Sequence, residues 1–107
     1  MKAGSADLVF GALADPNRRA ILELIAGRGP ATPTELSAEL AISRQGASKH
    51  LGSLVEAGIL DAERSGREVR YGMVEGGLEP GSAWLSRVGS EWSDRLGALK
   101  RHVDERP

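Results

Sequence analysis

The chain has 107 residues, which suits one domain, and it contains no cysteine, so disulfides, thiolate metal sites and cysteine nucleophiles are excluded. Its formal net charge of -1 argues against a protein that coats nucleic acid by bulk charge, but it leaves room for a local basic surface. The apolar runs are too short to cross a membrane, and residues 1–4 lack the apolar stretch of a secretion signal, so we expect a cytoplasmic protein.

Three helices are predicted in the first part of the chain. Residues 5–14 carry apolar side chains at helical spacing, and Asp15 followed by proline predicts that a second helix starts directly afterwards, over 16–26. Residues 32–35 (TPTE) form a capping-box pattern with proline at the first helical position. This pattern predicts a short third helix over 33–40.

The rest of the chain changes its periodicity twice. After a tight connection, a fourth helix is predicted over 44–57, and residues 59–64 and 68–74 then read as the two strands of a hairpin. The glycines and the proline within 76–81 predict a break in regular structure. A final long helix is expected over 82–104.

The order of these elements predicts the fold class. Two short helices joined by a short turn match a helix-turn-helix, and a hairpin directly after them is a wing. We therefore expect a mostly α protein with a small β-hairpin, namely a winged helix-turn-helix of five helices and a two-stranded wing. It would form a single winged-helix DNA-binding domain over residues 1–107.

The fourth predicted helix has the pattern of a DNA-recognition helix. Its apolar residues share one side: Ala47, Leu51, Leu54 and Val55. Polar residues cluster near its N-terminal end, where a recognition helix meets base edges in the major groove, and arginine, glutamine and serine suit those edges. The candidate DNA-binding residues here are Ser43, Arg44, Gln45, Ser48 and Lys49. The alternative is the solvated face of an ordinary amphipathic helix.

Three arginines surround the turn of the predicted hairpin. Arg64, Arg67 and Arg70 lie in a segment whose one acidic residue is Glu68. On a wing, such arginines reach phosphates or an adjacent minor groove, so we predict that all three bind DNA. The alternative is a solvated hairpin face.

Four segments in order resemble one protein family. They are residues 12–19 (ALADPNRR), 43–51 (SRQGASKHL), 54–60 (LVEAGIL) and 64–71 (RSGREVRY). Together they resemble the ArsR/SmtB family of winged-helix regulators, and the resemblance extends over about residues 8–104. It implies a homodimeric transcriptional repressor that binds an imperfect palindrome in double-stranded DNA, with the first and last helices forming the dimer.

The last predicted helix supports the dimer independently. Its large apolar residues fall in a stripe about 120° wide on a helical wheel, and a helix of that length spans about 30 Å, more than a small domain easily buries. We expect a symmetric dimer interface, although the stripe packing only on its own domain is the alternative. The candidate interface residues are Phe10, Leu13, Trp84, Leu85, Val88, Trp92, Leu96 and Leu99, and Val103 continues the stripe.

Metal sensing is common in the family that the chain resembles, but the pattern here is incomplete. The family's thiolate site needs cysteines, and its second site needs paired ligands on the last helix. His102 and Glu105 match one half of that pattern, whereas Gly89 and Glu91 stand where the other half requires ligands. Residues 92–99 resemble the branch without a metal site. We therefore predict no metal and no cofactor, with Glu91, His102 and Glu105 across a dimer as the alternative.

Two other classes of function compete with DNA binding. An enzyme would need converging acid, base or nucleophilic groups, and the two histidines are far apart with no phosphate-loop or hydrolase motif. A winged helix that binds protein rather than DNA is the stronger rival, and it would show little salt dependence on nucleic acid. The operator and the inducing signal are not encoded in any readable pattern.

Overall fold

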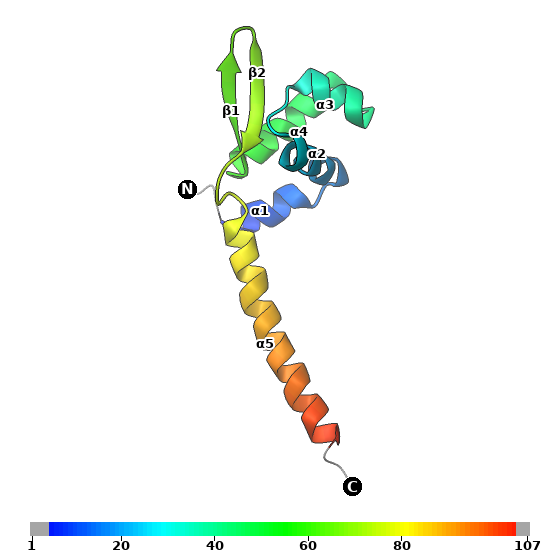
Figure 1. Cartoon of the computed structure of the whole chain (residues 1–107), viewed down its shortest axis with the longest axis vertical. Coiled ribbons are helices and arrows are strands. Elements are labelled where there is room, and N and C mark those ends of the chain that lie inside the picture. The colour runs from blue at the N-terminus through cyan, green and yellow to red at the C-terminus, as the bar shows by residue number, and fades with distance from the viewer. Residues whose placement is uncertain (1–4, 105–107) are drawn as a thin grey trace.

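The fold class predicted from the sequence is confirmed by the computed structural model, which describes residues 5–104. Within this range, five helices and a two-stranded sheet follow one another along the chain. The first four helices and the hairpin form a body, and the last helix projects away from it (Figure 1). The elements are α1 (Ala6–Leu13), α2 (Pro16–Arg28), α3 (Pro33–Leu40), α4 (Arg44–Glu56), β1 (Leu60–Ser65), β2 (Glu68–Met73) and α5 (Glu79–Asp104).

Side-chain caps start each of the first four helices. An oxygen of Ser5, Asp15, Thr32 or Ser43 accepts a hydrogen bond from a backbone N–H two or three positions later. These bonds satisfy amides that have no partner within the helix. At the third helix the predicted capping box is complete, because the Glu35 carboxylate also accepts from the Thr32 N–H at 3.0 Å.

The end of α2 differs from the prediction. The helix continues two residues beyond the expected end at residue 26, through Gly27 to Arg28. Gly29 stops it with a φ of 103°, in a region where a side chain is strained, whereas Gly27 has a helical conformation. The two arginines that open α2 also bind the preceding helix: Arg18 Nε donates to the Ala12 carbonyl at 2.7 Å, and Arg19 Nη1 donates to the Leu13 carbonyl at 2.6 Å.

The hydrophobic core lies between α1, α2, α3, α4 and the base of the hairpin. Its largest fully buried side chains are Val9, Ile21, Ile25, Leu36, Leu51, Leu54, Ile59 and Leu60. They come from elements on either side of the α3–α4 turn, so the helix-turn-helix and the body form one packed unit.

The hairpin is joined to the rest of the body by a contact that the sequence pattern did not indicate. β1 and β2 pair antiparallel from Leu60–Met73 to Ser65–Glu68 around a two-residue turn in which Gly66 has a φ of 65°. Ala31, between α2 and α3, then pairs with Tyr71: its N–H donates to the Tyr71 carbonyl at 3.1 Å and its carbonyl accepts from the Tyr71 N–H at 2.9 Å. This bridge connects the segment between α2 and α3 to the root of the wing.

The last helix begins earlier than predicted. Residues 80 and 81 were expected to break the chain, but α5 starts at Glu79 and includes both. Proline is tolerated in a first turn because its missing N–H would have no helical partner there. Gly81 lets α5 approach α1 closely, since a Cβ at this position would lie 2.8 Å from Val9 Cγ1.

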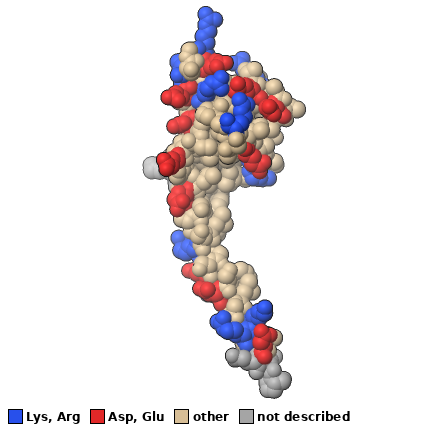
Figure 2. Space-filling view, viewed as in Figure 1, with Lys and Arg blue, Asp and Glu red and all other residues tan. Residues whose placement is uncertain are grey.

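Beyond its first turns, α5 leaves the body and is exposed on all sides in this single chain. Much of its visible surface is uncharged, with the charged residues gathered in separate groups (Figure 2). No helix within residues 5–104 combines the length and the apolar character needed to cross a membrane.

The turn between β2 and α5 gives a test of the packing. A Cβ at Gly77 would lie 2.7 Å from the Gly58 carbonyl oxygen and 3.0 Å from Ile59 Cα, so backbone would have to move. We expect Gly77→Ala to lower the free energy of unfolding by about 1–3 kcal/mol in urea denaturation. Gly52→Ala is the control: its Cβ meets nothing within 4 Å on an exposed helical site, so it should be neutral or stabilising. Equal effects of the two changes would contradict the proposed packing.

Candidate nucleic-acid interface

The predicted recognition residues lie together on the exposed side of α4. Ala47, Leu51 and Leu54 are buried on the other side of the helix, which leaves its polar residues facing solvent. Ser43, the N-cap, accepts from the Gly46 N–H at 2.9 Å and keeps its own O–H available as a donor. The residues exposed here are Ser43, Arg44, Gln45, Ser48 and Lys49.

The turn before α4 sets the angle between the two helices of the helix-turn-helix. Ala41 ends α3 in the left-handed conformation, with a φ of 56°. The Ser37 hydroxyl donates to the Ile42 carbonyl at 2.5 Å and closes the turn from inside. Helices α3 and α4 pack directly on each other, so the N-terminal end of α4 is held by contacts on both sides of the turn.

The three wing arginines have different surroundings. Arg64 and Arg67 are exposed, and Arg67 lies in the turn at the tip of the hairpin. The register pairs Glu63 with Arg70 and Arg64 with Val69, so alternation along the strands puts Arg64 and Arg70 on opposite faces of the hairpin. Arg70 is also half-buried, which separates it from the other two.

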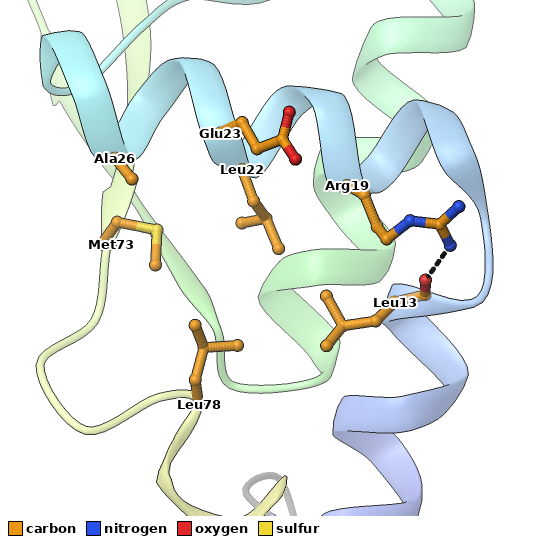
Figure 3. A pocket seen from close by; sticks show the side chains of 7 residues that line it. All are labelled: Leu13, Arg19, Leu22, Glu23, Ala26, Met73 and Leu78. Carbon is orange, nitrogen blue, oxygen red and sulfur yellow. Dashed lines mark hydrogen bonds between the residues drawn. The ribbon is translucent and has the colours of Figure 1, made fainter. Parts of the chain in front are cut away.

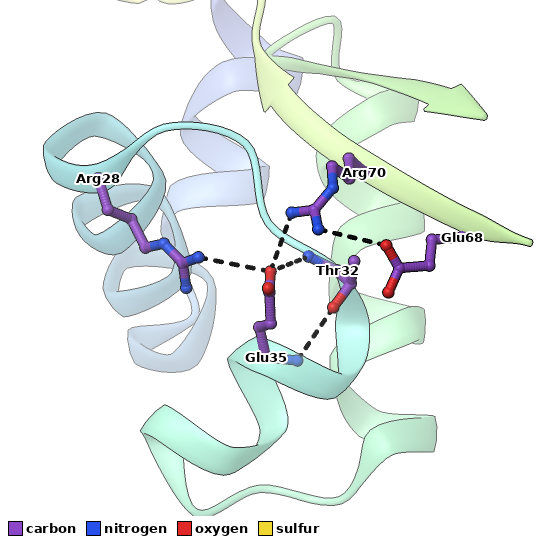
Figure 4. A network of polar contacts seen from close by, with 5 residues as sticks. All are labelled: Arg28, Thr32, Glu35, Glu68 and Arg70. Carbon is purple, nitrogen blue, oxygen red and sulfur yellow. Dashed lines mark hydrogen bonds and ion pairs between the residues drawn. The ribbon is translucent and has the colours of Figure 1, made fainter. Parts of the chain in front are cut away.

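Arg70 belongs to a charged network at the root of the wing (Figure 4). Its Nη1 donates to Glu35 Oε1 at 3.3 Å, and its Nη2 donates to Glu68 Oε1 at 3.2 Å. The same oxygen of Glu35 lies 3.5 Å from Arg28 Nη2. The carboxylate therefore connects the end of α2, the start of α3 and strand β2.

The pKa of the Glu35 carboxyl is lowered, mainly because the carboxylate accepts a hydrogen bond from the Thr32 N–H. Partial desolvation raises this pKa, and the charges of Arg70 and Arg28 lower it. At the start of α2, desolvation raises the pKa of Asp15, but hydrogen bonds from the Asn17 and Arg18 N–H groups outweigh it and the net pKa is lowered. Both carboxylates are thus stabilised in the ionised form by the helix that they cap.

A groove of about 280 Å³ separates the wing from the helix-turn-helix. Arg44 and Ser48 line it from α4, Arg67 from the hairpin turn and Thr34 from the first turn of α3. The sequence pattern predicted Arg44 and Ser48 on the recognition helix and Arg67 on the wing, but it did not predict Thr34. A polar residue at the start of the third helix was the signal that could have identified Thr34. The arrangement brings two guanidinium groups to one channel together with several hydroxyl-bearing side chains and the carboxylate of Glu68.

The predicted interface residues on α5 form an exposed apolar stripe. Phe10 of α1 packs edge-to-face on Trp84, with ring centroids 5.5 Å apart, whereas Leu13 lies half-buried against the core. The exposed fractions along the stripe run from 36% at Val88 to 61% at Trp92. Its members are Trp84, Leu85, Val88, Trp92, Leu96, Leu99 and Val103.

The residues of the alternative metal site are separated within one chain. Glu91 and His102 lie on the same helix about 16 Å apart along its axis, so one ion cannot bind both without a second chain. Glu105 lies outside the described residues. Over residues 5–104, no three His, Asp or Glu side chains gather in a way that could hold a metal ion.

Known proteins share both the sequence and the architecture described above. Residues 13–63 match the model of a helix-turn-helix domain. An ArsR-like transcriptional regulator of known structure from Rhodococcus sp. RHA1 is 35% identical, with a TM-score of 0.76 over 94% of each chain.

Two curated relatives are transcriptional regulators from other bacteria. The transcriptional repressor SdpR of Bacillus subtilis is 32% identical over 72% of this chain and 84% of its own length. The arsenic resistance transcriptional regulator ArsR1 of Pseudomonas putida is 36% identical over 74% of this chain and 70% of its own length.

The charge of Glu35 can be tested by pH. Because the pKa of Glu35 is lowered in the folded state, its stabilising effect is complete above the ordinary pKa of 4.5 and is lost as pH falls through the lower folded value. Glu35→Gln removes the charge but keeps a capping side chain. We therefore expect the difference in free energy of unfolding between wild type and Glu35→Gln to be constant at neutral pH and to shrink below about pH 4.5.

Denaturation at a series of pH values measures this difference. Glu39→Gln, one turn further along α3, is the control, because Glu39 is exposed and forms no ion pair within the described part of the chain. A Glu35→Gln difference that does not change with pH would show that the charge of Glu35 does not stabilise the fold, either through the Thr32 N–H or through the two arginines.

Proposed function

Because the chain belongs to the ArsR family of winged helix-turn-helix transcriptional regulators, we propose that it is a cytoplasmic, homodimeric repressor that binds a palindromic operator in double-stranded DNA. The observation that carries this proposal is α4, whose apolar side is buried while Arg44, Gln45 and Lys49 face solvent. The proposal includes no catalysis, no metal and no cofactor.

The exposed side of α4 carries the groups that major-groove recognition needs. We assign Arg44 and Gln45 to base edges, since arginine bonds guanine O6 and N7 and glutamine bonds adenine N6 and N7. Ser43, Ser48 and Lys49 are assigned to phosphates or bases beside them. Within residues 5–104, these five side chains make no hydrogen bond or ion pair other than the capping bond of Ser43.

The wing extends the proposed interface beyond the recognition helix. Arg64 and Arg67 are exposed at and near its tip, where they are free to reach the backbone or the minor groove. We propose a different part for Arg70: its ion pairs with Glu35 and Glu68 hold the wing against the helix-turn-helix, and any phosphate contact would be made from that position.

The apolar stripe of α5 supports the homodimer. Seven large apolar residues more than one-third exposed are unusual for a soluble surface, and contiguous apolar patches mark interaction sites. A second copy is the partner that a symmetric repressor on a palindrome requires. Two recognition helices in such a dimer would match half-sites about 34–36 Å apart, one turn of DNA.

Selection from random double-stranded DNA tests the proposal directly. We expect an enriched palindrome with half-sites about one helical turn apart. On that site Arg44→Ala should cost about 1–3 kcal/mol and relax the preference at one base pair. Arg87→Ala, which removes the same charge from the exposed surface of α5, should leave the affinity unchanged.

Other outcomes of this selection have defined meanings. An equal loss on all sequences would make Arg44 a phosphate contact only. No enrichment at moderate salt, together with weak salt dependence, would favour a winged helix that binds protein. Enrichment only with added zinc would favour a metal-responsive regulator.

The dimer is tested by Trp92→Ala. Trp92 is 61% exposed in the single chain, so truncating it removes little packing there, but a central aromatic anchor typically contributes about 2 kcal/mol or more to an interface. We expect sedimentation equilibrium to show a weaker dimer. Ser90→Ala, on the opposite side of α5, is the control. An unchanged dimerisation constant for Trp92→Ala would exclude the stripe from the interface.

A further inference from the structure

A hollow of about 280 Å³ lies on the body between α2, the end of α1, the end of β2 and the turn before α5 (Figure 3). It lies apart from the recognition residues on α4 and from the α5 stripe, whereas Met73 is the last residue of β2 and Leu13 is also one of the predicted interface residues. Its lining residues are Leu13, Arg19, Leu22, Glu23, Ala26, Met73 and Leu78.

The floor of the hollow is apolar. Leu22 is almost fully buried beneath it, and the side chains of Leu13, Met73 and Leu78 point toward its centre from three other segments (Figure 3). Leu78 remains 36% exposed, so part of its apolar surface is available to an occupant of the hollow. The volume is close to the lower end of the range for small-molecule sites, about 300–1,000 Å³, so the occupant is small.

The rim carries one positive and one negative group. Arg19 and Glu23 are both exposed and stand one helical turn apart on α2, yet they form no ion pair with each other within the described structure. Arg19 Nη1 donates to the Leu13 carbonyl at 2.6 Å, which holds the guanidinium at the rim with further N–H groups available. The Glu23 carboxylate stands above Leu22 (Figure 3).

We propose that this hollow binds a free α-amino acid with an apolar side chain. The carboxylate of the ligand pairs with Arg19, its ammonium group pairs with Glu23, and its side chain packs on Leu22 and Leu78. This ligand chemistry matches the whole site, because a simple acid or a simple amine would engage one of the two rim charges, whereas an α-amino acid engages both.

The position of the hollow suggests that a bound amino acid regulates DNA binding. This regulatory step rests on the proposed function, whereas the binding of the amino acid does not. Met73 ends the wing strand, Leu78 precedes α5 and Leu13 ends α1, so the ligand would touch each segment that links the DNA-reading elements to the dimerisation helix. A ligand that contacts these segments differently in two arrangements shifts the balance between them. The amino acid would then change the affinity for the operator.

Calorimetric titration of the full chain with L-leucine, L-methionine and L-phenylalanine, without DNA, tests the binding step. We expect saturable binding of at least one of them. The controls are glycine and, for the amino acid that binds, its analogues without the ammonium group or without the carboxylate. Each control loses either the apolar contact or one charged contact, so its affinity should be lower by a factor of about ten or more.

Three variants connect the binding to the hollow. Arg19→Gln and Glu23→Gln should each weaken binding about tenfold, and Ala26→Leu should weaken it by filling the space. Glu39→Gln on α3 is the charge-matched control and should have no effect. If Arg19→Gln destabilises the chain through its bond to Leu13, Glu23→Gln and Ala26→Leu still decide the question, because neither residue makes a polar side-chain contact within the described structure.

Several results would overturn the inference. They are no saturable binding of any of the three amino acids, binding that the variants leave unchanged, or a shift in the monomer–dimer equilibrium by Ala26→Leu without ligand, which would mean that a second copy covers the hollow. Operator affinity is measured separately, with and without the amino acid. Binding that leaves this affinity unchanged would refute the regulatory step, whereas a chain that binds no DNA would refute the proposed function and leave the binding result standing.

Discussion

The buried side of α4 is the constraint on which the rest of the structure depends. Leu51 and Leu54 are fully buried in the core, and burying a leucine stabilises a protein by about 1.5–3 kcal/mol. Any rotation of α4 about its axis would bring these side chains into water. The packing of the apolar side therefore determines the orientation of α4, and Arg44 and Lys49 on the polar side face solvent.

Polar contacts set the wing in relation to that helix. A two-stranded hairpin is marginal on its own, so its orientation depends on what holds its base. Here Tyr71 exchanges two backbone hydrogen bonds with Ala31, while Arg70 and Glu35 connect β2 to the first turn of α3. Because α3 also packs on α4, these contacts position Arg67 of the hairpin turn across the groove from Arg44. The network therefore supports the geometry of the proposed interface from behind.

In contrast to α4, most of helix α5 leaves its apolar side exposed. Its first turns pack on α1 through Gly81 and Trp84, and over the rest of its length no other part of the described chain buries the apolar stripe. A helix of this kind gains most of its stability from a partner. In the proposed dimer, folding of α5 and association of two chains would be coupled. A ligand in the hollow would contact Leu78, directly before α5, and so would act where this helix joins the body.

The sequence by itself determined the order of the elements and the exposed side of α4, because caps and apolar periodicity act over three or four residues. Asp15 and Thr32 begin helices as predicted. Only the tertiary structure decided which charges meet. Arg70 pairs with Glu35, 35 positions away, and no local pattern distinguishes it from the other wing arginines. The start of α5 and the hollow beneath Arg19 likewise depend on how distant segments pack, since a short-range pattern contains no information about which side chains come together in space.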